Sequence, residues 1–283
     1  MGHIAAGPKR TATCLPPATR AFLCNILEPL SLEVYTLLGL TPGVNPPNLT
    51  QLILERIASG KKIWEFAGRA VFDIGEGLVV KTGGDLDHKR EEAGAMRFLA
   101  ECTPSVPAPR CMGLVTIGKK SLLFMTEISG DTLECRWPTL NAASKIDIQQ
   151  SLNKVTSILR SVEESKDQPF GSFSGRCRDT RMFDRYTESL VHDEGASNKF
   201  LLTSPPSRVS SNYKSWIASM LRTDHRMVFT HGDLHPRNVL VTDSPDGGIC
   251  LSGIIDREAS GFYPEYWEHL KALNTRGTWD ESD

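Results

Sequence analysis

The densest group of residues able to do chemistry lies between His231 and Asn238, in the order His-Gly-Asp-Leu-His-Pro-Arg-Asn. This polar stretch places the carboxylate of Asp233 five positions before the carboxamide of Asn238, and the apolar run Val-Leu-Val follows it. Loops flanked by strands are exposed on one side and rigidly held, and binding and catalytic groups are often found there. The stretch therefore predicts a loop that holds a carboxylate and a carboxamide at a fixed place beside a sheet.

A second carboxylate, Asp256, closes the apolar run of residues 249–255. If this run pairs in an antiparallel hairpin with residues 239–241, Asn238 and Asp256 lie at the same end of the hairpin. Mg²⁺ binds few protein oxygens and completes its shell with water and phosphate oxygens. We therefore expect Asn238 and Asp256 to be the ligands of a Mg²⁺ ion that also contacts phosphate.

The same motif, taken alone, is compatible with other chemistry. His231, Asp233 and His235 alternate along the chain and are residue types that bind Zn²⁺, as in a metal-dependent hydrolase. An ordinary polar turn would also have this composition. Detection of Zn²⁺ in the purified protein would favour the hydrolase, and binding of Mg-ATP would count against it.

Apolar periodicity before residue 129 is mostly that of strands. It predicts a helix, a hairpin, a second helix and two further strands, in that order, over residues 48–58, 70–74 with 78–81, 86–101, 110–117 and 121–128. Residues 1–47 are dense in Pro, Gly and Thr and are expected to form a partly disordered extension. Residues 48–128 are then the first lobe.

Residues 129–283 are expected to form a second, mainly helical lobe. Helical spacing occurs around residues 148–162, 213–221 and 264–273. The middle segment carries an apolar stripe that includes Tyr213 and Trp216, and we expect this stripe to lie in the core.

Composition and charge exclude several classes of protein. The chain has 283 residues, and its 32 Lys and Arg against 34 Asp and Glu give a net charge of −2, which argues against binding nucleic acid by bulk electrostatics. It has no apolar run of the roughly 18 residues that span a bilayer and does not start like a signal peptide. The seven cysteines include no C-x-x-C pair, which is typical of reduced thiols. We expect a cytoplasmic protein without nucleic-acid or membrane partners.

The motifs resemble those of a known family. The His-Gly-Asp form of the loop with Pro236 and Asn238, then Ile-Ile-Asp-Arg-Glu at 254–258, then Gly-Phe-Tyr-Pro-Glu-Tyr-Trp at 261–267, is similar to the pattern of the aminoglycoside phosphotransferase and choline kinase branch of the protein-kinase-like fold, in the form carried by filamentous fungi. The resemblance runs from about residue 48 to the end and is strongest at 228–268.

This resemblance implies an α+β fold with two lobes. The first would be a small antiparallel sheet with one helix, the second larger and mainly helical, with ATP in the cleft between them. It implies transfer of the γ-phosphoryl group of ATP, with Mg²⁺, to a hydroxyl of a small molecule. Asp233 would accept the proton of that hydroxyl or orient it, and His231 would hold the loop.

The resemblance also assigns residues of the first lobe to the nucleotide. Lys81, fixed by Glu92, would neutralise phosphate charge, and the adjacent Glu91 would face solvent. Met125, Glu127 and Ile128 lie in the stretch that resembles the hinge, whose backbone edge holds adenine.

Departures from the family pattern leave an alternative open, a catalytically weak pseudokinase or binding protein of the same fold. Residues 74–77 are expected to cover the phosphates but form a shorter loop than in protein kinases. Arg257 stands where the branch has Trp, and could repel Mg²⁺ or stabilise transferred phosphate. Glu258 could contact a second metal or be a surface carboxylate. The chain also ends soon after Tyr266, so residues 279–283 are expected to fray and the acceptor site to be open.

Overall fold

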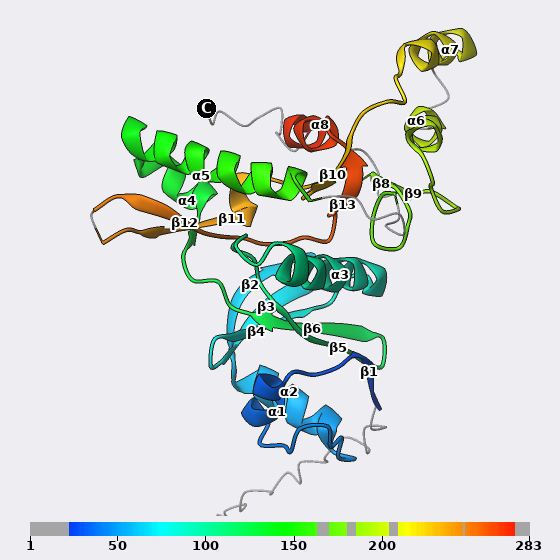
Figure 1. Ribbon diagram of the computed structural model, residues 1–283. Helices are drawn as coiled ribbons and strands as arrows, with labels where there is room; N and C mark the ends of the chain where they lie inside the picture. Colours follow the sequence, from blue (N-terminus) through cyan, green and yellow to red (C-terminus); the bar gives the residue numbers. More distant parts are fainter. Residues whose placement is uncertain (1–22, 163–169, 180–184, 204–208, 246, 275–283) are drawn as a thin grey trace, which may run out of the picture.

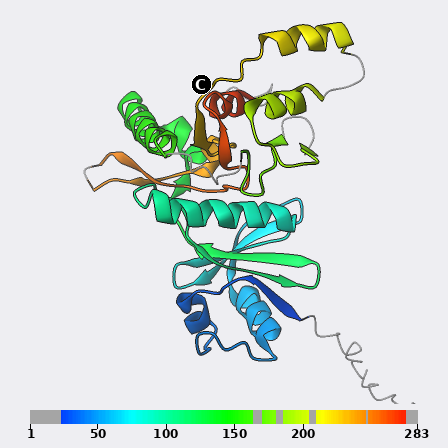
Figure 2. The same ribbon diagram turned by 45° about the vertical axis from the view of Figure 1, so that its right-hand side comes forward.

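A computed structural model describes residues 23–162, 170–179, 185–203, 209–245 and 247–274 of the protein. Figure 1 shows two lobes, with helix α3 (Leu86–Cys102) lying between the sheet of the first lobe and the second lobe. The view turned by 45° shows α3 in the same place (Figure 2). The architecture is therefore the α+β fold that the sequence predicts, whereas the predicted fraying of residues 279–283 lies outside the described residues.

The first lobe is built on a six-stranded antiparallel sheet with the strand order β1-β5-β6-β4-β3-β2. The strands are β1 (Cys24–Glu28), β2 (Lys61–Phe66), β3 (Arg69–Gly75), β4 (Leu78–Thr82), β5 (Cys111–Ile117) and β6 (Lys120–Thr126). The predicted hairpin is β3–β4, whose turn needs positive φ at Gly75 and Gly77. Strand β2 was not predicted, because its residues are exposed along its whole length and lack an alternating burial pattern.

Helices cover both faces of this sheet. Helices α1 (Leu32–Leu37) and α2 (Leu49–Ser59) pack on one face through a cluster that includes Leu78 and Val80, and α3 packs on the other with Val79. Because successive side chains of a strand point to opposite faces, Lys81 lies on the same face of β4 as Val79. The alternation thus directs the lysine toward α3 and the second lobe.

The first lobe starts earlier along the chain than the predicted boundary at residue 48. Strand β1 pairs with β5 at the edge of the sheet. Val34 and Tyr35 of α1 are buried in the same cluster as Ile53 of α2. The apolar residues between Pro-rich segments therefore complete the core of this lobe.

A short connector joins the lobes. The backbone N–H of Glu127 donates to the carbonyl of Gly77 (2.8 Å), which fixes the start of the connector to the first lobe. Strand β7 (Asp131–Thr132) pairs with β11 (Val239–Asp243) of the second lobe. Between them, Gly130 has φ +129°, and a Cβ there would lie 2.5 Å from the carbonyl oxygen of Val241.

The second lobe combines helices with two small sheets and one further strand pair. Its remaining elements are α4 (Leu133–Arg136), η1 (Trp137–Thr139), α5 (Ala142–Arg160), β8 (Arg178–Asp179), β9 (Arg185–Tyr186), α6 (Glu194–Thr203), α7 (Ser211–Met220), β10 (Met227–Thr230), η2 (Pro236–Asn238), β12 (Ile249–Ile254), β13 (Gly261–Pro264) and α8 (Trp267–Asn274). Strands β12, β11 and β7 form one sheet, and β10 pairs with β13 in another. Within the described residues, no helix is both long and apolar enough to cross a membrane.

Helix α5 forms the core of the second lobe with these sheets. Val155 and Leu159 of α5 are buried with Phe229 of β10, Ile254 of β12 and Phe262 of β13. This packing holds the ends of β10 and β12 close together. The His-Gly-Asp motif that follows β10 and the carboxylate of Asp256 that follows β12 are positioned by the same core.

Helix α7 forms as predicted but does not lie in the core. Tyr213 is 51% exposed and Trp216 is 54% exposed. The helix extends away from the body of the second lobe in both views (Figures 1 and 2). The expectation that this stripe is core was wrong, because helical spacing identifies an apolar face but not what covers it.

Candidate active site

Four charged side chains meet between the lobes around Lys81. Its Nζ atom lies 2.9 Å from Oε2 of Glu92 on α3 and 2.6 Å from Oδ1 of Asp256, which follows β12. Glu258 is farther away, with Oε2 at 3.9 Å. The structure therefore brings Lys81, Glu92 and Asp256 together from three elements that are far apart in the sequence.

Charge pairing outweighs burial for this lysine. Burial alone would lower the pKa of Lys81, but the charges of Glu92 and Asp256 raise it above its ordinary value. Burial likewise disfavours the ionised form of Asp256, yet the charge and hydrogen bond of Lys81 hold its pKa below the usual range. Both groups are charged near neutral pH.

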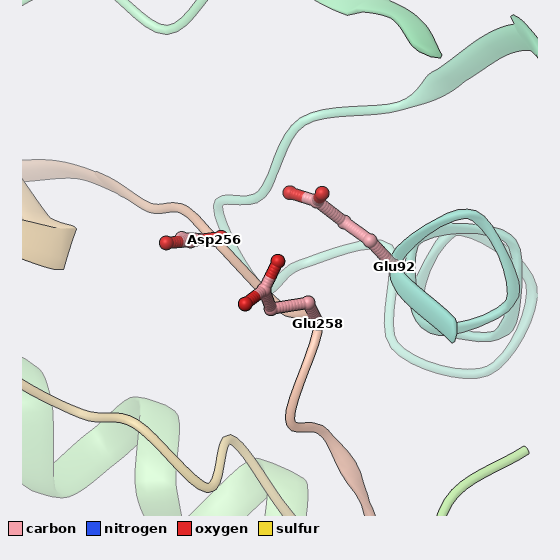
Figure 3. A group of neighbouring side chains, drawn as sticks. All are labelled: Glu92, Asp256 and Glu258. Carbon is pink, nitrogen blue, oxygen red and sulfur yellow. The ribbon is translucent and has the colours of Figure 1, made fainter. Parts of the chain in front are cut away.

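Glu258 is an interlobe residue. Its carboxylate lies 3.2 Å from Nη1 of Arg69 in the first lobe and 3.7 Å from Nη2 of Arg178 in the second. Figure 3 shows its side chain and those of Glu92 and Asp256 converging, and oxygens of the three lie within 4.8 Å of one another. At 16% exposure Glu258 is no surface carboxylate, and its contacts are with cations.

The motif of residues 231–238 forms a compact loop around Asp233. The Nδ2 atom of Asn238 donates to the backbone carbonyl of Asp233 (2.9 Å) and to its Oδ2 (3.0 Å). Arg237 donates to the same Oδ2 from 3.1 Å. The carboxylate is thus fixed on one side, and the side chain of Asp233 remains 27% exposed and open to a substrate.

His231 is buried beneath this loop as a neutral group. Burial, followed by the charge of Arg257, lowers the pKa of His231 to about 3. Its Nε2 donates to the carbonyl of Ile255 (2.9 Å), and Nδ1 accepts from the backbone N–H of Asp233 (3.2 Å). Since both ring nitrogens are engaged, the geometry gives His231 the role of holding the loop, and it does not fit a Zn²⁺ ligand of a hydrolase.

Glu268, at the start of α8, was missed by the sequence reasoning. Its carboxylate accepts hydrogen bonds from the backbone N–H groups of His231 (2.5 Å) and Gly232 (3.2 Å). Burial raises the pKa of Glu268, and these two hydrogen bonds oppose the effect. Gly232 has a φ of +77°, and a Cβ there would lie 2.3 Å from the carbonyl oxygen of Ala259. For both reasons the position favours glycine. Only the position after the Tyr-Pro-Glu-Tyr-Trp run pointed to this glutamate.

Replacing Glu268 with Gln is expected to loosen the catalytic loop. The amide puts an NH2 group in place of one carboxylate oxygen, so the backbone N–H of Gly232 loses its 3.2 Å bond and faces another donor, at a cost of about 2 kcal/mol. We expect the melting temperature to fall by roughly 5 °C and turnover to fall by about tenfold or more. Thermal melting and initial rates measure both, and unchanged values would show that this carboxylate does not hold the loop.

Asn238 and Asp256 lie at the same end of the β11–β12 hairpin, as the sequence predicts. Val239 pairs with Ile254, and the N–H of Ile255 donates to the carbonyl of Asn238 (2.9 Å). Carboxylate and carboxamide oxygens are ligands that suit Mg²⁺. The side chain of Asp256 is 33% exposed, so phosphate and water can reach it. The residues present therefore fit a Mg²⁺ ion.

The three residues predicted to form the hinge differ in whether their backbone N–H groups are already bonded. Met125 is buried in the core with Val79 and Leu123, and the N–H of Glu127 is already bonded to Gly77. The N–H of Ile128 makes no hydrogen bond to the part of the chain that the structure describes. Of the three predicted hinge residues, Ile128 is the one with a backbone donor available to a base.

The predicted phosphate-covering loop lies at the wrong end of its hairpin. Gly77 is beside Glu127, at the connector. The turn near the carboxylates is instead the one between β2 and β3, residues 66–69, from which Arg69 reaches Glu258. The prediction at 74–77 failed because strand β2, and with it this second hairpin, was not recognised.

Two further expectations about side chains were wrong. Glu91 is 6% exposed rather than solvent-facing, because the second lobe covers α3. Arg257 is 1% exposed, so it does not face Mg²⁺ or phosphate. Its guanidinium nitrogens have no hydrogen-bond partner among the described residues, and burial, opposed mainly by the charge of Glu268, lowers the pKa of Arg257 to about 10.

Comparison with protein families decides the relationship. The model of the phosphotransferase enzyme family matches residues 75–282, which is most of the chain and includes Lys81, Glu92, Asp233, Asn238 and Asp256. The chain belongs to the phosphotransferase enzyme family. A search of curated proteins found no match.

Solved structures similar to this phosphotransferase family member show the kinase-like fold. The streptomycin–ATP ternary complex of APH(2'')-IIa is 15% identical, with a TM-score of 0.53, and the alignment covers 80% of this chain and 75% of that one. ADP-bound APH(2'')-Ib is 16% identical with a TM-score of 0.53, and the alignment covers 77% of this chain and 72% of that one. APH(3'')-Id from Streptomyces rimosus ATCC10970 is 15% identical with a TM-score of 0.51, and the alignment covers 89% of this chain and 86% of that one.

Proposed function

We propose that this member of the phosphotransferase family transfers the γ-phosphoryl group of ATP to a hydroxyl group of a small molecule. The observation that carries the proposal is the convergence between the lobes of Lys81, Glu92 and Asp256, with the partly exposed Asp233 on the adjacent loop. Phosphoryl transfer needs a cation at the phosphates, a metal ligand and a base, and Lys81, Asp256 and Asp233 would supply them in that order. ATP is also a ligand of the similar structure of APH(2'')-IIa.

In the proposed reaction the acceptor hydroxyl oxygen bonds to the γ-phosphorus as the bond from that phosphorus to the bridging oxygen breaks. ADP leaves with the bridging oxygen, and the hydroxyl proton passes to Asp233. Lys81, held by Glu92, neutralises phosphate charge. When bound, Mg²⁺ supplies further positive charge at the phosphates, and Asp256 and Asn238 would hold it. Such catalysis consists of positioning and electrostatic stabilisation.

The neutral His231 supports the reaction indirectly. It is uncharged near neutral pH, and its two nitrogens tie Ile255, next to the carboxylate proposed to bind the metal, to the backbone of Asp233. We infer that it keeps the base and the metal-binding residue in register.

Mg-ATP is expected to stabilise the folded protein. At about 100 times its dissociation constant a ligand adds roughly 2.7 kcal/mol, which should raise the melting temperature by about 5–10 °C. Melting curves with Mg-ATP, Mg-GTP, ATP with chelator, and Mg²⁺ alone measure the effect and its nucleotide preference. Absence of a shift with both nucleotides would contradict the proposal. Consumption of ATP, screened first against aminoglycosides and then other hydroxylated metabolites, identifies the acceptor.

A further inference from the structure

Helix α3 presents a second acidic residue beside Glu92, and this residue faces the second lobe. Oε1 of Glu91 accepts a hydrogen bond from Oγ of Ser172 (3.0 Å). The backbone N–H of Ser174 lies 3.2 Å from Oε1 and 3.3 Å from Oε2 of the same carboxylate. A buried carboxylate of the first lobe is thus bound by a loop of the second.

The partner of α3 is the segment of residues 171–178, which contacts the helix over several turns. Nη2 of Arg178 lies 3.2 Å from Nδ1 of His88, three positions before Glu91. Three positions after it, a Cβ on Gly94 would lie 3.2 Å from Cγ of Phe173. Residues three and four apart share one face of a helix, so these contacts fall on a single face.

The 171–178 segment is itself anchored in the second lobe. The N–H of Gly171 donates to the carbonyl of Phe262 in β13 (2.7 Å), and the N–H of Phe262 donates back to the carbonyl of Gly171 (2.8 Å). Phe173 also packs against Phe229 of β10, with ring centroids 6.2 Å apart. The segment therefore connects α3 to β10, which leads into the loop of residues 231–238, and to β13, which pairs with β10.

Because Glu91 and Glu92 are adjacent on a helix, fixing one fixes the rotation that sets the direction of the other. We propose that Glu91 is a positioning residue: its bonds to the 171–178 segment hold α3 so that Glu92 meets Lys81 before any nucleotide binds. The role of Lys81 toward ATP rests on the proposed function, whereas the pairing of Lys81 with Glu92 does not.

The first experiment needs no nucleotide. Labelling of the lysines by an amine-reactive acetylating reagent, read at Lys81 by peptide mass spectrometry, reports how firmly that amine is held. Glu91→Ala is expected to raise labelling of Lys81 about tenfold. Glu101→Ala, an exposed position on the same helix, is the matched control and should leave it unchanged. Equal labelling of Lys81 in wild type and Glu91→Ala would overturn the proposal, whether or not the protein binds ATP.

The second experiment measures Mg-ATP affinity in a double-mutant cycle. If Glu91 acts through Glu92, Glu91→Ala weakens binding about tenfold in the wild-type background and by less than twofold in the Glu92→Gln background. If Glu91→Ala weakened binding by the same factor in both backgrounds, Glu91 would act independently of Glu92 and the proposal would be overturned. If the wild-type protein did not bind Mg-ATP, the proposed function would be refuted. Labelling of Lys81 would still decide the role of Glu91.

A milder variant covers the case in which Glu91→Ala does not fold. Ser172→Ala removes one donor and keeps the carboxylate and the backbone bond from Ser174. It should raise labelling of Lys81 two- to threefold with a melting curve close to wild type. No increase in a folded Ser172→Ala protein would count against the positioning role.

Discussion

Replacing Asp233 with Asn is expected to lower turnover about a thousandfold, within the range that a positioned acid–base group contributes. The affinity for Mg-ATP should change by less than about twofold, because Lys81 and Asp256, which we assign to the phosphates and the metal, are not altered. The variant keeps the shape of the loop, since Asn can still accept a hydrogen bond from Asn238. Single-turnover rates with the identified acceptor and equilibrium titration with Mg-ATP separate the two effects.

Asp224→Asn is the matched control for this substitution, because Asp224 is exposed and pairs with Arg222 in a surface ion pair that contributes little to stability. It should leave turnover and affinity unchanged. Turnover by Asp233→Asn close to that of wild type would show that another group takes the hydroxyl proton.

Replacing Asp256 with Asn should fail in a different way, by weakening binding of Mg-ATP about a hundredfold or more. Replacing a residue that only hydrogen-bonds to a metal ligand already lowers metal affinity about 10–100-fold, and Asp256 is proposed to be a ligand itself. The substitution also takes the negative charge out of the 2.6 Å contact with Lys81. Titration of nucleotide affinity against Mg²⁺ concentration should show the Mg²⁺ requirement moving to higher concentration.

Asp243→Asn provides the control for a lost surface carboxylate on the same hairpin, since Asp243 is 74% exposed and pairs with Arg136. Equal nucleotide affinities in the Asp233 and Asp256 variants would contradict the separate roles given to these two residues.

The parts of the site that were predicted from sequence depend on short-range geometry. The spacing of Asp233, Asn238 and Asp256 is set by one loop and one hairpin, so the pattern of residues was enough to place them. Lys81 was placed by the resemblance to the family, and alternation along β4 explains why it lies on the face that meets α3.

The parts that were missed depend on packing between distant segments. Helical spacing separates the directions of Glu91 and Glu92 but does not say that residues 171–178 cover the first of them. The same limit applies to Trp216, whose apolar helix face remains exposed. Strand β1 was missed because it is held by pairing with β5, far along the chain, and helix α1 because it is buried by packing against α2 and the sheet.

The connector between the lobes sets how the cleft can move. Its start is fixed by the bond from Glu127 to Gly77, and its end by the pairing of Asp131 with Val241. Only residues 128–130 lie between these points, and contact with Val241 leaves no room for a side chain at Gly130. An opening of the cleft at this connector would be a rotation about one pivot. It would have to break the contacts of Arg69 with Glu258 and of Lys81 with Asp256, and to move α3 relative to residues 171–178. Hinge rotations of this kind occur in microseconds to milliseconds, so under the proposed function the lifetime of these contacts bears on how fast ADP leaves.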